Sequence, residues 1–78
     1  MREYDLHLHR FDEAKTAALG FVDRLYYDGE PCGRLIHGQG IIADHLPDWL
    51  AEYPFVIRIE RDVVNGGSTV VWLAYRDA

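Results

Sequence analysis

Residues 32–50 read CGRLIHGQGIIADHLPDWL, and this stretch decides the fold. A short apolar run over 32–37 is followed at once by the glycine-rich turn HGQG, and then by apolar residues at helical spacing. Short apolar strands that lead directly into helices are typical of parallel sheets covered by those helices. We therefore expect a strand over 32–37 and a helix within 41–54.

Pro47 decides where that helix is expected to begin. A proline inside a helix removes a backbone donor and clashes with the carbonyl four residues earlier. With Asp44 as the N-cap residue, Pro47 falls in the first turn, where its missing N–H costs little. The helix is therefore expected to begin near Asp44, or else to be kinked.

The flanking sequence completes the pattern on both sides. Residues 4–8 resemble a strand, and the stretch DEAKTAALGFVDRLYY (12–27) follows with apolar residues at helical spacing. After the second helix, 55–61 and 69–75 resemble two strands joined by the turn VVNGGS. Trp49 and Trp72 fit core positions on the second helix and the last strand. The predicted order is βαβαββ, a two-layer α/β sandwich with two helices on a four-stranded mixed sheet.

Length and charge limit what the chain can be. Its 78 residues allow one domain, expected to span 1–78 and to stand alone. It has no apolar run of membrane-spanning length and no secretory signal, so we expect no membrane partner and a cytoplasmic location. The net charge is −5, with only 8 Lys and Arg residues. Any contact with nucleic acid should therefore use a local patch and be weak and salt-sensitive.

Polar side chains are expected to converge where the first two strands end. Parallel strands joined by right-handed crossovers finish at one edge of a sheet, so Asp5 and His7 should approach His37. The hairpin after the third strand returns from the same edge and brings the turn of Asn65, Gly66 and Gly67 there. Ligands of open α/β sheets bind at this edge. Topology thus predicts one site built from three segments.

The residue types at this site suit phosphodiester cleavage. Side chains alternate along a strand, so Asp5, His7 and His9 should point the same way. A carboxylate orients an imidazole, and two imidazoles exchange opposite protons. We expect one of His7 and His37 to act as base, the other as acid, and Asp5 as the orienting group.

The turns add predicted phosphate contacts, and metal binding is the rival chemistry. Backbone N–H groups of Gly38, Gln39 and Gly40, before a helix, can approach a phosphate closely. Gly66 and Gly67 are expected to assist, although a hairpin requirement for positive φ explains them equally. No cofactor is required by the sequence. A divalent metal is the alternative, held chiefly by His7 and His9.

Several of these segments resemble one known family. The succession DLH (5–7), HGQG (37–40), Trp49-Leu50 and GGSTVVWL (66–73) is similar to the small MutS-related (Smr) domain. The resemblance implies a fold like the C-terminal domain of bacterial translation initiation factor three. It also implies an endonuclease, a hydrolase that nicks DNA or cleaves RNA in several relatives. Carried over by position, it indicates Asp5, His7, His37, Gly38 and Gly40.

The sequence departs from the family pattern at three places, one of which is Pro47 in the second helix. Leu8 replaces the glycine that usually follows the first histidine, and Ile42-Ala43 replaces a Leu-Arg pair after the second turn. A basic residue is thereby missing, and Arg10, at the start of the first helix, is the expected substitute. The alternatives to a nuclease are a non-catalytic module that docks nucleic acid or a protein partner, and a His-based metal-binding domain.

Overall fold

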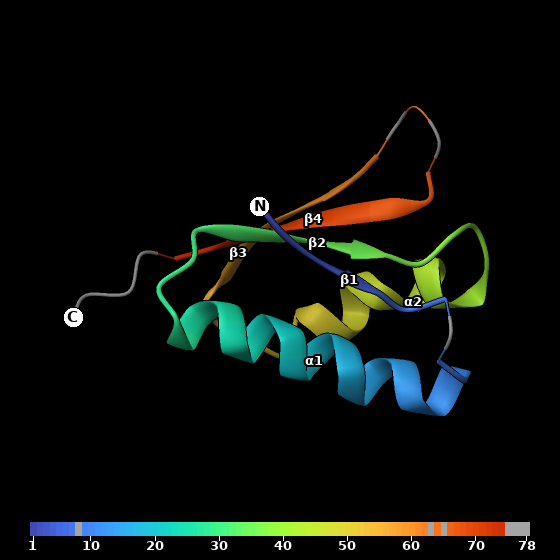
Figure 1. The fold of residues 1–78 in the computed structure, drawn as a ribbon, viewed down its shortest axis with the longest axis horizontal. Coiled ribbons are helices and arrows are strands. Elements are labelled where there is room, and N and C mark those ends of the chain that lie inside the picture. Colours follow the sequence, from blue (N-terminus) through green and yellow to red (C-terminus); the bar gives the residue numbers. More distant parts are fainter. Residues whose placement is uncertain (8, 63, 65, 75–78) are drawn as a thin grey trace.

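The computed structural model describes residues 1–7, 9–62, 64 and 66–74. Six elements follow one another in the predicted order, as Figure 1 shows. They are β1 (Arg2–Asp5), α1 (Phe11–Tyr27), β2 (Cys32–Ile36), α2 (Ile41–Leu50), β3 (Val56–Arg61) and β4 (Ser68–Leu73). The predicted end of the last strand, at Tyr75, lies outside the described residues.

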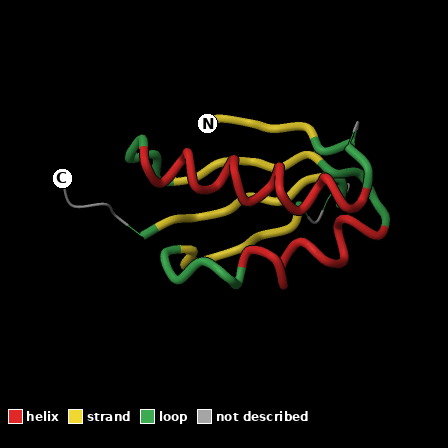
Figure 2. The backbone as a smooth tube through the Cα atoms, turned by 90° about the horizontal axis from the view of Figure 1, so that it is seen from below, coloured by secondary structure: helices red, strands yellow, loops and turns green. Residues whose placement is uncertain are grey.

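The four strands form one mixed sheet with the order β1-β2-β4-β3. β1 and β2 are parallel, whereas β4 is antiparallel to both β2 and β3. The first three strands therefore point the same way, as predicted, but β4 is inserted between β2 and β3. Both helices cover one face of the sheet and leave the other uncovered (Figures 1 and 2).

The core lies between the helices and the covered face. Alternate residues of the two central strands point into it, among them Leu35, Val71 and Leu73, which are at most 4% exposed. From the helices come Ala14, Ala18, Val22, Leu25, Leu46, Trp49 and Leu50. The sequence periodicity thus identified the buried helical faces correctly.

Trp72 was predicted to be a core residue, and this is wrong. Along β4 the side chains of Thr69, Val71 and Leu73 are buried on the covered face, and Trp72 alternates with them on the uncovered face, where Ser68 is also buried. Trp72 is only partly buried there, and its indole N–H donates to Glu60 at 3.0 Å. The apolar sequence around Trp72 does not show which residues face the core, because an aromatic ring suits either face of a strand.

β1 ends earlier than residues 4–8 predicted. It pairs with β2 from Arg2↔Gly33 to Asp5↔Ile36, and the chain turns immediately afterwards. Asp5 causes this turn, because its carboxylate accepts the backbone N–H of His7 at 2.8 Å. His7 and His9 therefore follow the strand and do not continue its side-chain alternation.

α2 begins earlier than predicted, and Asp44 is not its N-cap. The cap is Gly40, to whose carbonyl the N–H of Asp44 donates at 3.3 Å. Pro47 consequently lies inside the helix, where the loss of one hydrogen bond is unfavourable. The start at Ile41 allows Ala43 and Leu46 to be buried, and this burial offsets the lost hydrogen bond.

No helix within the described ranges is long and apolar enough to cross a membrane.

Candidate functional site

Three segments meet at the edge where β1 and β2 end. The backbone N–H groups of His37 and Gly38 both donate to the carbonyl of Gly67, each at 2.9 Å. The ring of His7 lies directly against Gly38. The turns after β1 and β2 and the β3–β4 hairpin are thus in contact. The predicted Asn65 lies outside the described residues.

Asp5 and His7 form a pair on the surface. Nδ1 of His7 lies 2.9 Å from Oδ1 of Asp5, and the two side chains are 51% and 53% exposed. The backbone N–H of His7, and then its ring, hold the pKa of Asp5 below its usual value. Because a carboxylate only accepts, the neutral His7 ring carries its proton on Nδ1. Its Nε2 lone pair is therefore left to accept a proton.

His37 is close to this pair but lies in opposite surroundings. It is 5% exposed, and both of its ring nitrogens have partners inside the protein. Nδ1 lies 2.5 Å from the carbonyl oxygen of Gly38, and Nε2 lies 2.7 Å from Oγ1 of Thr69. A carbonyl only accepts, so Nδ1 carries the proton and Nε2 accepts from the Thr69 hydroxyl.

Burial lowers the pKa of His37, and the positive charge of Arg61 acts in the same direction. The neutral side chain thus links the turn after β2 to the start of β4 by hydrogen bonds. The structure brings His37 beside His7 in the fold without leaving it a nitrogen to exchange a proton with a substrate.

Gly38 fits closely between the two histidines. Its φ is +69°, a left-handed conformation that side chains other than glycine adopt at a cost. A Cβ at this position would also overlap Nε2 of His7. Its N–H was expected to approach a phosphate, but it is already bonded to Gly67. Gly38 therefore shapes the site by its lack of a side chain.

The other predicted turn residues lie around this contact. Gln39 and Gly40 are exposed, and Gly40 is the N-cap of α2. Gly66 has a φ of +68°, as a tight hairpin requires, whereas no positive φ is found at Gly67. Gly67 contributes its carbonyl instead, which joins the hairpin to the second turn.

His9 turns away from His7, so the expected common face of residues 5, 7 and 9 is wrong. Its Nε2 lies 2.9 Å from the Tyr4 hydroxyl, and the two rings stack with centroids 5.6 Å apart. This separates the two histidines that were expected to hold a metal. Within the described part of the chain, no group of three or more His, Cys, Asp or Glu residues is arranged for metal binding.

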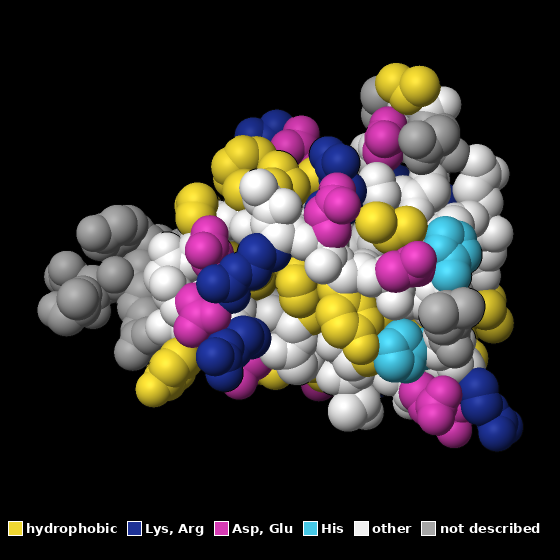
Figure 3. Space-filling model, in the orientation of Figure 1, with side chains coloured by type: hydrophobic (Ala, Val, Ile, Leu, Met, Phe, Trp, Pro, Cys, Tyr) yellow, Lys and Arg dark blue, Asp and Glu magenta, His cyan; other side chains and the backbone are white. Residues whose placement is uncertain are grey.

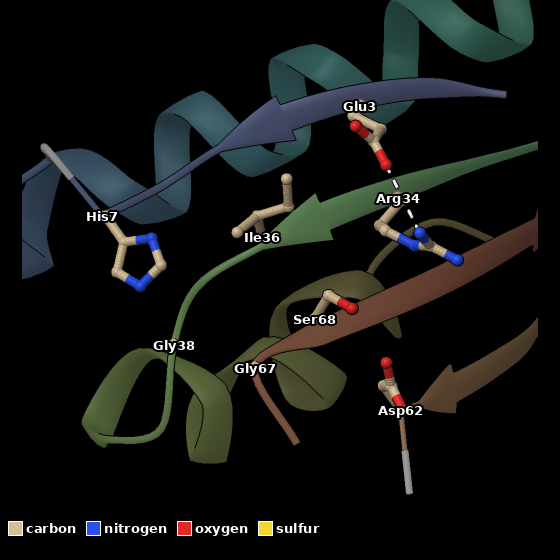
Figure 4. Close-up of a pocket in the computed structure, with 8 residues that line it drawn as sticks. All are labelled: Glu3, His7, Arg34, Ile36, Gly38, Asp62, Gly67 and Ser68. Atoms are coloured by element: carbon tan, nitrogen blue, oxygen red, sulfur yellow. Dashed lines mark hydrogen bonds and ion pairs between the residues drawn. The ribbon is translucent and has the colours of Figure 1, made fainter. Parts of the chain in front are cut away.

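The His7 ring borders a shallow hollow of about 360 Å³ on the uncovered face of the sheet (Figure 4). The described residues that line it are Glu3, His7, Arg34, Ile36, Gly38, Asp62, Gly67 and Ser68. Figure 4 shows the imidazole at one end, beside Gly38, and the paired Glu3 and Arg34 at the other. The hollow combines an imidazole, a hydroxyl, a guanidinium and carboxylates.

Charges of both signs surround this hollow. In Figure 3 histidine side chains reach the surface at the end of the molecule where β2 finishes, and acidic groups lie beside them. Basic and acidic side chains alternate over the described part of this view, with no broad basic patch. Electrostatic attraction for an anion must therefore come from individual side chains.

Neither Arg10 nor Arg61 is among the described residues that line the hollow beside His7. Arg10, from which a phosphate contact was expected, is 83% exposed on its side chain and lies 3.9 Å from Asp12. Arg61 ends β3, donates to the carbonyl of Gly66 at 3.0 Å, and lies 3.9 Å from Asp44 in α2. The topological argument could have found it, because the third strand also ends at this edge.

The fold and site define an α/β domain with one uncovered sheet face and a histidine pair at the ends of its parallel strands. The family model of the Smr domain matches residues 4–74 of the chain. The chain therefore belongs to the Smr domain family, which is associated with nucleic-acid binding and nuclease-related roles. A search of curated protein sequences gives no match.

Two solved structures share the fold. The chain is similar to the Smr domain of Thermus thermophilus MutS2, with a TM-score of 0.85 and 23% identity, covering 94% of this chain and 98% of that one. It is also similar to YdaL, a stand-alone small MutS-related protein from Escherichia coli, with a TM-score of 0.84 and 20% identity. That match covers 92% of this chain and 63% of YdaL. At these identities the likeness shows the fold alone.

Proposed function

We propose that the chain is an endonuclease that hydrolyses phosphodiester bonds of nucleic acid, with Asp5 and His7 as its reactive pair. The observation that carries the proposal is the 2.9 Å contact between Nδ1 of His7 and Oδ1 of Asp5 at the border of the hollow. This contact fixes the imidazole and leaves Nε2 as the proton acceptor. Membership of the Smr family supports nucleic acid as the substrate.

The pair can perform one half of general acid–base catalysis. His7 Nε2 takes a proton from the attacking water as the water oxygen bonds to phosphorus, and Asp5 stabilises the imidazolium that results. The bond from phosphorus to the leaving oxygen then breaks, and that oxygen takes a proton from solvent. The sequence predicts that one of His7 and His37 acts as base and the other as acid, but His37 fits a positioning role better, because both of its nitrogens are bonded and its ring is buried.

A divalent metal remains a proposal to be tested alongside the pair. In the described part of the chain no three His, Cys, Asp or Glu side chains are arranged to hold such an ion, so the need for a metal has to be measured directly. Cleavage should therefore be measured with added Mg²⁺ or Mn²⁺ and with a chelator. Strict dependence on the metal would assign the charge stabilisation of phosphate to the ion.

The test is cleavage of labelled single-stranded and double-stranded RNA and DNA by the wild-type domain and two variants. His7→Gln should reduce the rate by about 100-fold or more, and Asp5→Asn by a smaller factor. His45→Gln, at an exposed histidine of α2, is the matched control and should cleave like the wild type. A His7→Gln variant that cleaves at the wild-type rate would contradict the assignment.

The second candidate is a module that binds nucleic acid without turnover. It is favoured by one observation, namely that His37 is engaged within the fold and leaves the Asp5–His7 pair without a second imidazole for acid catalysis. Binding of any of the four substrates without cleavage, under all metal conditions, would select this function over the nuclease.

A further inference from the structure

Arg34 lies in the middle of the uncovered sheet face, where two hollows meet. It lines the hollow that contains His7 and also a second one of about 360 Å³ that extends across β4 and β3. The described residues of this second hollow are Arg34, Glu60, Arg61, Asp62, Ser68 and Val70. Three residues belong to both, so a continuous depression leads from His7 over the sheet.

The guanidinium of Arg34 has more donors than partners. Its Nε is buried without a hydrogen-bond acceptor among the described residues, and its Nη1 reaches Glu3 at 3.3 Å, which is long for a charged pair. Arginine carries five N–H donors, and leaving a buried donor unsatisfied is unfavourable. The Arg34 side chain as a whole is 40% exposed, so an acceptor from solvent can reach the part of the guanidinium beyond the buried Nε.

The neighbouring carboxylates bind other groups of the chain. Glu60 accepts from Arg58 at 2.9 Å and from the indole of Trp72 at 3.0 Å. Asp62 accepts the backbone N–H of Val64 at 2.9 Å. Because Glu3 is the one described carboxylate that pairs with Arg34, the guanidinium keeps donors for an acceptor from outside the chain. Oxygens of a phosphate match a guanidinium in charge and in geometry.

Trp72 supplies a second feature on the same face. In the β2–β4 ladder Arg34 is opposite Val70 and Cys32 is opposite Trp72, so Trp72 is two residues along β4 from the position opposite Arg34, on a diagonal. The indole is only partly buried. An aromatic ring on an open sheet stacks an unpaired base, whereas the bases of a duplex are already stacked on one another.

From these contacts we infer that the uncovered sheet face binds a single-stranded segment of nucleic acid along β4. Arg34 holds a phosphate next to the phosphodiester at His7, and Trp72 stacks a base. This inference rests on the proposed function and names its substrate class. Glu3 and Asp62 oppose the anion, so the affinity should be modest and should fall with salt.

The test is the binding of a fluorescent, uncleavable single-stranded phosphorothioate oligonucleotide and its duplex, measured by anisotropy at several salt concentrations. Arg34→Gln should weaken single-strand binding about tenfold. It should also reduce the slope of log affinity against log salt concentration by the contribution of about one phosphate contact. Arg24→Gln on α1, which makes the same charge change on the helix side of the molecule, is the matched control and should bind like the wild type. Equal binding by both variants, or tighter binding of the duplex, would overturn the inference.

Two further variants separate a binding contact from a structural role. Glu3→Gln should tighten binding several-fold by releasing the guanidinium, and this gain should vanish in the Glu3→Gln/Arg34→Gln double variant. The oligonucleotide should quench tryptophan emission in the wild type but not in Trp72→Phe, because Trp49 is buried in the core. Additive effects of Glu3→Gln and Arg34→Gln, or quenching that persists in Trp72→Phe, would contradict the proposed path.

These experiments distinguish a failure of the binding proposal from a failure of the nuclease proposal. His7→Gln should abolish cleavage while changing oligonucleotide affinity less than about threefold, since His7 is uncharged when it acts as a base. If Arg34→Gln binds normally while His7→Gln stops cleavage, the proposed nuclease activity is supported and the proposed binding of a single strand along β4 is wrong. If binding depends on Arg34 but neither the wild type nor any variant cleaves, the single-strand binding is supported and the proposed nuclease activity is wrong.

Discussion

The turn after β1 and the turn after β2 each contain a histidine, and the two imidazoles lie in opposite surroundings. His7 is half exposed, with one nitrogen bonded to a carboxylate and the other at the border of the hollow. His37 is buried, with one nitrogen bonded to a carbonyl and the other to a hydroxyl. Two residues that a sequence pattern treats as equivalent therefore differ in the one property that proton transfer needs, a free nitrogen.

The difference follows from the sheet and from the turn after β1. β2 is a central strand, flanked by β1 and β4, so the residue after it lies beneath the hairpin that begins β4. β1 is an edge strand, but the residue directly after it, Leu6, is buried, and the turn held by the Asp5 carboxylate then places His7 on the surface. The central position of β2 thus buries His37, and the local turn after β1 exposes His7.

The largest expected effect is on stability, from removing His37. His37→Ala leaves the Gly38 carbonyl and the Thr69 hydroxyl without a partner in a buried place, and it opens a cavity. We expect a loss of about 3 kcal/mol in the free energy of unfolding, measured by urea denaturation. His7→Ala, the matched variant at the exposed histidine, should lose less than about 1 kcal/mol. Equal losses would remove the distinction between the two turns.

A smaller loss is expected when Gly38 gains a methyl group. Gly38→Ala must place alanine at a φ of +69° and against the His7 ring, which should destabilise the fold by about 2 kcal/mol and displace the imidazole. Gly20→Ala is the control, because Gly20 is inside α1 with open space around its Cβ position. It should stabilise by about 0.5–1 kcal/mol. A Gly38→Ala variant with the same free energy of unfolding as the wild type would show that the two turns are not tightly packed.

The pH dependence of stability sharpens the comparison further. Burial lowers the pKa of His37 in the folded state, so the unfolded chain binds its proton more readily. The stability from the neutral ring is complete above the unfolded pKa of about 6.5, and it is lost as the pH falls from there through the folded pKa. The free energy of unfolding should therefore decrease from pH 7.5 to pH 5, and less so in His37→Gln. An identical slope in both proteins would contradict the buried, neutral assignment.

The smallest effect on stability is expected from Asp5→Asn. The Asp5–His7 pair is exposed, and such pairs contribute about 0–1 kcal/mol. The asparagine oxygen can still accept the backbone N–H of His7, so the turn should persist. Thermal unfolding near pH 7 should shift by only a few degrees. A loss comparable to that of His37→Ala would mean that the pair serves the fold.

The fold could be predicted from the sequence because its signals are local. Apolar spacing, the two glycine turns and the order of elements were sufficient for βαβαββ and for the edge at which three segments meet. What failed was determined by one local side-chain hydrogen bond and by core packing. The Asp5 turn ended β1 early and separated His7 from His9, and the core packing of α2 moved its start to Ile41 despite Pro47.

The meeting of three segments at one edge was predictable from the sequence, but the surroundings of each side chain there were not. Topology could bring His37 to the right edge, yet its burial depends on Thr69, 32 positions away in the chain. Arg34 carried a weak signal, as the one charged residue of the strand CGRLI. Its importance depends on an unpaired Nε and on the two hollows beside it, which no sequence pattern records.

The most direct test is the state of the four imidazole rings, read from long-range ¹H–¹⁵N spectra between pH 7.5 and pH 5. His37 should be neutral at pH 7.5 with its proton on Nδ1, should exchange that proton slowly, and should resist protonation below pH 6.5. The Nδ1 proton of His7 should exchange fast, because the Asp5–His7 pair faces solvent. A protonated His37 at pH 7.5, a proton on its Nε2, or exchange as fast as that of His7 would contradict the separation of a reactive histidine from a structural one.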